Sequence, residues 1–330
     1  MQFAQLKAMR KILWMSFAVG ACLNCAAAFC QDSTSNSTVT THTLPSYGSF
    51  VIQPSIEYTM TSSQRISVSG FTLFQAILIG KVQASRLDQK LVIPAITFRW
   101  RLKQLQLWAQ VPWLYRADQE VVPVKDHEEE ISLDSNHIGD VEMGVYYPFF
   151  KQTLTLPGIA LTMRFKTRTG RSPYGLPTKV FNTNLPPQQT EFPTGNGHYG
   201  VALGLNFVKT TDPAVLFFNM DYFYNIPRDI GVKGGTNYGN IDPGNSFEFS
   251  FGEVFALNEY LSTSLYYDER LTGVTTQNGN TVVGSDVTVA TFNFTVTYAT
   301  GRRSISLNTA LGLTRDASDV DLLLRVPFGL

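Results

Sequence analysis

The clearest pattern of hydrophobic and polar positions along the chain runs from residue 138 to residue 170. In its first half, apolar side chains fall on the odd positions from Val141 to Phe149, with the polar Glu142 and the small Gly144 between the first of them. In its second half, the same alternation runs from Ile159 to Phe165. A period of two is typical of a β-strand with one apolar face. The pattern therefore predicts a two-stranded hairpin with its turn at residues 151–157.

The same alternation recurs from residue 50 to the end of the chain. Short turns near residues 103, 153, 211, 258 and 301 alternate with longer connections, one of which is an acidic loop at 118–137. Outer-membrane barrels have short turns on one side and long loops on the other. We therefore predict an all-β fold, a transmembrane antiparallel up-and-down β-barrel of about 12 strands. An alternative of about 14 strands applies if residues 61–90 cross the membrane twice more.

Composition agrees with this fold class. Of 330 residues, 44% are hydrophobic and 16% are charged. No internal apolar run approaches the ~20 residues that a membrane helix needs. Aromatic side chains gather near the ends of the expected strands, as in the girdles that flank the apolar band of a membrane barrel.

The N-terminus predicts export from the cytoplasm. Residues 1–30 combine a basic start, an apolar stretch and small-residue cleavage positions after Ala28 or Cys30, as a signal peptide does. All three cysteines lie in this segment, so the mature chain would contain no thiol. The Ser- and Thr-rich residues 31–47 predict a flexible leader, and residues 48–330 the barrel. We expect the protein in the outer membrane of a Gram-negative bacterium.

If the apolar faces meet lipid, the alternate residues line the lumen. In the 138–170 hairpin this places Glu142 opposite Arg164 and Asp140 opposite Lys166, with Arg168 pointing inward near the extracellular mouth. A register shifted by two residues would still set acid beside base. The simpler interpretation is that these pairs stabilise the wall by ~0.2–1 kcal/mol each. The sharper one is a charged lumen that sets solute selectivity.

Further lumen-lining candidates follow from the same parity. They are mixed in sign, so they predict neither anion nor cation selectivity. These candidates are Glu57, Arg99, Gln106, Trp108, Gln110, Asp221, Glu248, Asp321 and Arg325. Trp108 stands out because its position points an aromatic ring inward, where it could contact an apolar or aromatic solute or fill space.

The chain gives little indication of catalysis or of cofactor binding. Its four histidines are scattered and lack metal-ligand spacing, so we expect no metal and no cofactor. A lipid or ester hydrolase would need a Ser/His/acid set, and only His198 lies at a strand edge, with no nucleophile motif beside it. We therefore expect a protein that is not an enzyme. The sequence has no basic patch for nucleic acid.

Several stretches, in order, resemble the MetA-pathway of phenol degradation family of outer-membrane proteins. They are IQPSIEYTMTSSQRISVSGFTLFQAILIGKV, LQLWAQVPWLYRAD, IGDVEMGVYYPFF, ALTMRFKTRTG, TGNGHYGVALGLNFVK and SFEFSFGEVFALNEYLSTSLYYDE. The resemblance implies an outer-membrane barrel for passage of small, aromatic or hydrophobic solutes, with no catalytic residues to carry over.

The partners expected from this resemblance and from the fold are outer-membrane lipid, the barrel assembly machinery and a small-molecule solute. Assembly signals usually end in an aromatic residue, whereas here Phe328 lies two residues before the end. Two other functions remain open. One is a non-conducting structural or adhesive barrel that acts through its extracellular loops, and the less favoured one is a barrel hydrolase.

Overall fold

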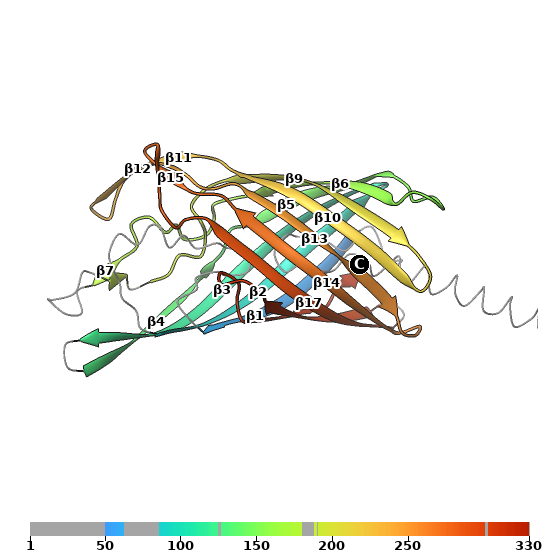
Figure 1. The fold of residues 1–330 in the computed structure, drawn as a ribbon, viewed down its shortest axis with the longest axis horizontal. Coiled ribbons are helices and arrows are strands. Elements are labelled where there is room, and N and C mark those ends of the chain that lie inside the picture. The colour runs from blue at the N-terminus through green and yellow to red at the C-terminus, as the bar shows by residue number, and fades with distance from the viewer. Residues whose placement is uncertain are drawn as a thin grey trace, which may run out of the picture.

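The computed structural model of the chain describes residues 50–62, 86–124, 127–179, 188–189, 191–300 and 303–329. The predicted signal peptide (1–30) and leader (31–47) lie outside these residues. Every regular element in the described part is a β-strand (Figure 1). The part of the chain that is described contains no helix of the length and apolarity needed to cross a membrane.

The described strands form one antiparallel barrel. In chain order its strands are β1 (Phe50–Ser62), β2 (Arg86–Leu102), β3 (Leu105–Val124), β4 (His127–Ile138), β5 (Glu142–Phe150), β6 (Gly158–Lys166), β9 (Gly200–Thr210), β10 (Ala214–Asn225), β13 (Ser246–Ala256), β14 (Leu261–Thr272), β17 (Val287–Thr300), β18 (Arg303–Gly312), β19 (Val320–Arg325) and β20 (Phe328–Gly329).

Pairing of β1 with both β2 and β19 closes the sheet. The short β20 follows β19 after a break at Pro327, which has no N–H to donate, and also pairs with β1. Strand β4 pairs with the far end of β3 and runs on into β5. With β4 and β20 set aside as extensions, the described residues form a closed barrel of 12 strands, which confirms the predicted fold class.

The 14-strand alternative was wrong. Strand β1 pairs with β2 continuously, from Phe50 opposite Trp100 to Ser62 opposite Asp88. No further strand can therefore lie between them in the wall. The connection at 63–85 lies outside the described residues.

Alternating exposure divides each strand into an outer apolar face and an inner face. On β5, the side chains of Met143 and Tyr147 are 42% and 41% exposed, whereas that of Tyr146 between them is buried. The same holds on β18, where Ile305 and Leu307 are exposed and Ser306 is buried. An exposed apolar band of this extent would be unfavourable in water, and lipid is the solvent that suits it.

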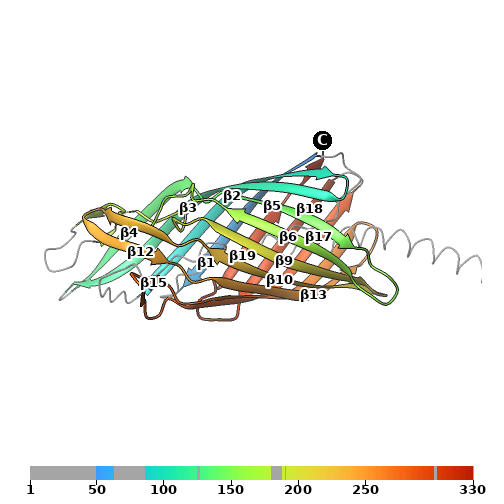
Figure 2. The same cartoon turned by 90° about the horizontal axis from the view of Figure 1, so that it is seen from above.

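The long connections gather at one end of the barrel, and the short turns and the C-terminus at the other (Figures 1 and 2). The predicted acidic loop at 118–137 is instead a β-hairpin that extends the barrel wall, because β3 and β4 pair from Trp113 opposite Ile138 to Val124 opposite His127. Valines and isoleucines among the acids favour extended backbone here, and the sequence interpretation gave more weight to the charges.

Other long connections fold into small sheets of their own. Strands β11 (Arg228–Lys233), β12 (Thr236–Asp242), β15 (Thr276–Gln277) and β16 (Asn280–Thr281) form a four-stranded sheet from two different connections. Strands β7 (Thr178–Lys179) and β8 (Gln188–Gln189) form a two-stranded one. Tyr174, Ile230, Tyr238 and Ile241 pack into a buried cluster, which ties the 167–199 connection to the four-stranded sheet.

The register of the 138–170 hairpin differs from the predicted one by two residues. Glu142 lies opposite Lys166, and Gly144 lies opposite Arg164. A bulge between Pro148 and Phe150 changes the register near the turn. Alternation does not distinguish the predicted register from the observed one, because a shift of two residues keeps each side chain on the same face.

Candidate functional site

Charged side chains converge on the inner face of β5, β6, β13 and β14. Arg164 donates from Nη2 to Oε2 of Glu248 at 2.9 Å, and its Nη1 lies 3.9 Å from Oε2 of Glu142. Nε of Arg270 lies 2.7 Å from Oε1 of Glu248. We call these four residues the paired cluster. Arg164 and Glu248 are almost wholly buried, and burial is tolerated because each charge has an opposite partner.

Small residues on β9 leave room for this cluster. Ala202 lies directly opposite Arg164, and Gly204 lies opposite Asp221 of β10. A Cβ added at Gly204 would come within 2.0 Å of Oδ1 of Asp221. Asp221 is itself opposite Glu248, and its Oδ1 accepts from Oγ1 of Thr162 at 3.2 Å. The acidic side of the interior therefore extends from β10 to β13, with Arg164 reaching it from β6.

The predicted ladder of Asp140, Glu142, Arg164, Lys166 and Arg168 is only partly assembled. Nζ of Lys166 lies 3.6 Å from Oδ2 of Asp140, and Arg164 lies near Glu142 as described above. Because of the shifted register, both contacts are diagonal rather than directly opposite. Arg168 does not join them. It is exposed, and its guanidinium lies 4.9 Å from the centre of the Tyr199 ring.

Asp140 holds the 167–199 connection to the wall. It is fully buried at the joint between β4 and β5, and its two carboxylate oxygens accept from the backbone N–H groups of Gly170 and Asn196 at 3.0 and 3.1 Å. Gly195 packs so closely that an added Cβ would lie 2.2 Å from Oδ1 of Asp140. Oγ1 of Thr194 donates to the Ile138 carbonyl at 2.6 Å. We call these contacts the mouth latch.

His198 continues the latch towards β10. Its side chain is fully buried, with Nδ1 3.1 Å from the Ile226 carbonyl and Nε2 2.8 Å from the Tyr174 hydroxyl. Burial lowers the pKa of His198 to about 4, and burial also raises the pKa of Tyr174. A neutral ring suits both contacts, since Nδ1–H donates to the carbonyl and Nε2 accepts from the hydroxyl. Because both ring nitrogens are engaged in this way, the geometry gives the hydrolase hypothesis no support.

The inner face of β1, β18 and β19 is also polar, and some of its oxygen atoms have no hydrogen-bond partner among the described residues. Glu57, Thr59 and Asp321 are nine-tenths buried or more. Within the described part of the chain, Oε1 of Glu57, Oγ1 of Thr59 and Oδ1 of Asp321 have no hydrogen-bond partner. Asp321 accepts at its other oxygen from Oγ of Ser318 at 2.5 Å. We call Glu57, Thr59 and Asp321 the acceptor group.

The other predicted lumen candidates have no single meeting point. Gln106 is buried, whereas Arg99, Gln110 and Arg325 are partly buried. Across the described ranges, no group of three or more His, Cys, Asp or Glu side chains is arranged to hold a metal ion.

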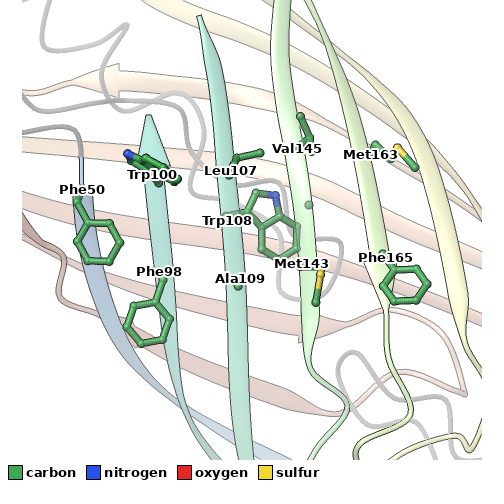
Figure 3. A pocket seen from close by; sticks show the side chains of 11 residues that line it. Phe50, Phe98, Trp100, Leu107, Trp108, Ala109, Met143, Val145, Met163 and Phe165 are labelled. Atoms are coloured by element: carbon green, nitrogen blue, oxygen red, sulfur yellow. The ribbon is translucent and has the colours of Figure 1, made fainter. Parts of the chain in front are cut away.

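Trp108 is buried and lies across from Gly144 of β5. A Cβ added at Gly144 would lie 2.7 Å from the indole, so the absence of a side chain there makes room for the ring. Figure 3 shows the ring among the side chains of an apolar pocket of about 400 Å³, lined by residues of β1, β2, β3, β5 and β6. Several lining side chains, such as Trp100 and Met163, are on the exposed outer face. This pocket therefore belongs to the apolar outer surface.

Arg270 of the paired cluster and Thr59 and Ser318 beside Asp321 were missing from the predicted set. Arg270 lies on β14, which runs to Thr272. Following the inward parity of that strand to its end would have found it. Thr59 has the same parity as Glu57, but an uncharged hydroxyl carries no signal on its own.

No protein-family model matches the chain. Among solved structures, it is similar to the COG4313 outer membrane channel from Pseudomonas putida F1, with 12% identity, a TM-score of 0.60 and coverage of 87% of this chain and 97% of that one. Weaker similarity extends to the translocator domain of the autotransporter NalP from Neisseria meningitidis, with 6% identity, a TM-score of 0.47 and coverage of 87% and 91%.

A third similar structure is the transport unit of the autotransporter AIDA-I from Escherichia coli, with 8% identity, a TM-score of 0.46 and coverage of 93% and 95%. The first of the three similarities supports the fold, which is that of an outer-membrane barrel. At this level of identity the similarity reaches no further than the fold.

Proposed function

We propose that this chain is an outer-membrane channel for small solutes. The observation that carries the proposal is the inner face of the closed barrel, where acids, bases, amides and hydroxyls alternate with an apolar outer face. A barrel with this arrangement can present a polar route through an apolar membrane. The predicted signal peptide and the exposed apolar band support an outer-membrane location within the same proposal.

The solute class follows from the chemistry of the inner face. Polar and charged side chains favour small polar or amphipathic solutes, since an apolar solute gains nothing from displacing the water around them. The family resemblance adds aromatic or hydrophobic solutes as a hypothesis. Trp108 does not strengthen it, because its ring also contributes to the outer pocket.

Liposome swelling tests both the channel and the solute class. Purified protein would be reconstituted into vesicles and exposed to iso-osmolar sugars, amino acids and a phenol of similar size. Swelling with polar solutes, at a rate that falls with solute size, is the expected result. Folded protein that leaves every solute impermeant would overturn the proposal. Faster entry of the phenol than of the polar solutes, corrected for protein-free vesicles, would favour the hydrophobic solute class.

The long connections favour a second candidate, a barrel that acts through its surface. They fold into sheets, and the buried cluster around Tyr174 and Tyr238 holds two of them together. Such ordered structure could form a binding surface. Limited proteolysis of the long connections would distinguish the two functions. A channel should keep its permeability as long as the barrel stays intact, whereas an adhesive barrel should lose its binding to cell surfaces or matrix.

A further inference from the structure

We propose that Phe217 and Tyr266 form an apolar constriction inside the lumen, near the short turns, which limits the size of the solutes that pass. The inference rests on the proposed channel function and names the residues that set its size limit. Phe217 is the fourth residue of β10, which begins directly after the short turn at residues 211–213. The constriction therefore lies towards the end of the barrel that is opposite the long connections.

Both rings belong to the inner face of the barrel. On β10 the buried Phe217 stands between the exposed Leu216 and Phe218, so it points inward. Tyr266 has the same parity on β14 as Arg270, the paired-cluster residue four positions further on. Phe217 and Tyr266 are only 5% and 2% exposed. An inward ring in a wide, water-filled lumen would keep contact with that water, so the protein closes over both rings.

Gly252 of β13 lets the two rings meet. The register sets Phe217 opposite Gly252 and Gly252 opposite Tyr266. A Cβ added at Gly252 would lie 2.3 Å from Cβ of Tyr266, so a larger residue there would displace the tyrosine. The ring centres of Phe217 and Tyr266 are 6.0 Å apart at an angle of 56°, within the range of packed aromatic pairs. The contact therefore spans three strands.

Valine side chains continue the constriction towards the short turns. Val215 and Val254 lie directly opposite each other, two residues from Phe217 and Gly252 respectively, and both are almost fully buried. Together with the two rings they form a single hydrophobic cluster on the inner face, against which the partly buried side chains of β9 and β13 pack. These are Val208 and Ala256.

A hydrogen bond holds the other end of Tyr266. Nδ2 of Asn308 on β18 donates to the Tyr266 hydroxyl at 2.8 Å and to Oγ1 of Thr295 on β17 at 2.9 Å. Because β17 lies between β14 and β18 in the sheet, the tyrosine side chain reaches over a whole strand. Side-chain contacts thus run from Phe217 to Asn308 across β10, β13, β14, β17 and β18. Tyr266 is fixed in place, as a permanent constriction requires.

An apolar constriction acts on solutes differently from the charged section above it. Its side chains offer few hydrogen bonds to replace the water that a solute or ion must shed, so passage becomes steeply dependent on solute size. Asp221 and Glu248 lie on the same face of β10 and β13, further from the short turns. The charged section and the constriction therefore act in series, and the constriction sets the upper limit of size.

Single-channel recording in planar bilayers, with liposome swelling by uncharged sugars of increasing size, tests the constriction. Phe217→Ala and Tyr266→Ala remove its two sides independently, so a variant that fails to fold leaves the other to decide. Both should raise the conductance step about two-fold or more and admit sugars that wild type excludes. Tyr266→Phe keeps the ring and should stay close to wild type.

The matched control is Phe218→Ala. It removes the same ring from the outer face of the same strand, where Phe218 packs on the ring of Phe207 with the centres also 6.0 Å apart. Its conductance step and size limit should equal those of wild type. An increase as large as that of Phe217→Ala would mean that loosening the wall, rather than opening the lumen, raises the current, and would overturn the proposal.

The remaining outcomes separate this inference from the proposed function. If wild type conducts and both inner variants keep its step size and size limit, the constriction is disproved and the channel stands. If wild type is ion-tight and the inner variants conduct, the constriction is supported, whereas wild type itself fails as an ion channel. If wild type and both folded inner variants are ion-tight, the constriction and the channel are both disproved.

Discussion

Two parts of the inner wall carry buried carboxylates, and the two groups of carboxylates differ in the partners that they have. In the part formed by β5, β6, β13 and β14, the carboxylate of Glu248 lies at hydrogen-bonding distance from the guanidinium groups of both Arg164 and Arg270. On β1 and β19, Glu57 and Asp321 lie within reach of each other, and one oxygen of each has no partner in the described structure. Both groups of strands fold into the same barrel from the same alternating pattern.

The contrast between the two parts of the wall shows that the parity of a position does not specify which partners its side chain will have. Alternation puts a residue on the inner face, but its energetic role depends on which neighbours the register and the small residues allow. Ala202 lies opposite Arg164, which reaches an acid on another strand, whereas Ala310 lies opposite Asp321 and presents only a methyl group. In the paired cluster each charge has an opposite charge close by, whereas each residue of the acceptor group has an oxygen without a hydrogen-bond partner among the described residues.

The largest effect is expected at the paired cluster. Glu248→Gln removes the acid shared by the buried Arg164 and the partly buried Arg270 and leaves both cations without their nearest acid. We expect the free energy of unfolding to fall by about 3–5 kcal/mol, because breaking a buried ion pair strands the remaining charge. Urea unfolding of protein in micelles, followed by tryptophan fluorescence, measures this change.

The control is Glu259→Gln, which removes the same charge from an exposed turn and should change stability by less than about 0.5 kcal/mol. Equal stability of Glu248→Gln and the control would show that the paired cluster contributes nothing to the free energy of unfolding. The two parts of the inner wall would then not differ in energy.

A smaller effect is expected from acid at the mouth latch, which lies at the long-connection end of β5, β6 and β9. The pKa of His198 is about 4 in the folded protein and about 6.5 in an unfolded chain. The unfolded state therefore binds more protons between these values, and stability falls as pH drops from about 6.5 towards 4. The total loss is on the order of 3 kcal/mol.

His198→Gln removes the titrating group but keeps hydrogen-bonding atoms for Tyr174 and Ile226. Its urea midpoint should change less between pH 7 and pH 4.5 than that of wild type. If both proteins show the same dependence on pH, other groups cause the acid sensitivity, and the role assigned to His198 in the latch is wrong.

The smallest effect, of the opposite sign, is expected at the acceptor group. Asp321→Asn removes a buried carboxylate that has one oxygen without a hydrogen-bond partner among the described residues, and it keeps an acceptor for Ser318. Stability should be unchanged or raised by about 1 kcal/mol, because an uncompensated buried charge is destabilising. Thermal unfolding followed by circular dichroism would detect this. A loss of stability in Asp321→Asn as large as that in Glu248→Gln would show that the two parts of the inner wall do not differ in this way.

The sequence was sufficient for the fold, because alternation and loop length are local signals that repeat in every strand. It also identified Glu57, Glu248 and Asp321 as inward positions by parity. It could not pair Arg164 with Glu248, because they are far apart in the chain and meet only when the sheet closes and β9 supplies small residues. The lumen assignment itself, with any role in selectivity, stays a prediction.

Two other failures have physical causes. The hairpin pairs two residues away from the predicted register, and a shift of two keeps every side chain on its own face, so the alternation is the same in both registers. The mouth latch rests on backbone N–H groups donating to Asp140 and on the close approach of Gly170 to Gly195, where an added Cβ would lie 2.8 Å from the neighbouring glycine. Neither kind of contact leaves a periodic trace in a sequence.

Single-channel recording in planar lipid bilayers tests the central claim that the polar inner face is a route through the membrane. Folded wild-type protein, added to one chamber in potassium chloride, should give discrete conductance steps, and Glu248→Gln should change the step size or its ion selectivity. Folded protein that inserts but leaves the bilayer as ion-tight as lipid alone would contradict the claim and leave a barrel that acts through its surface.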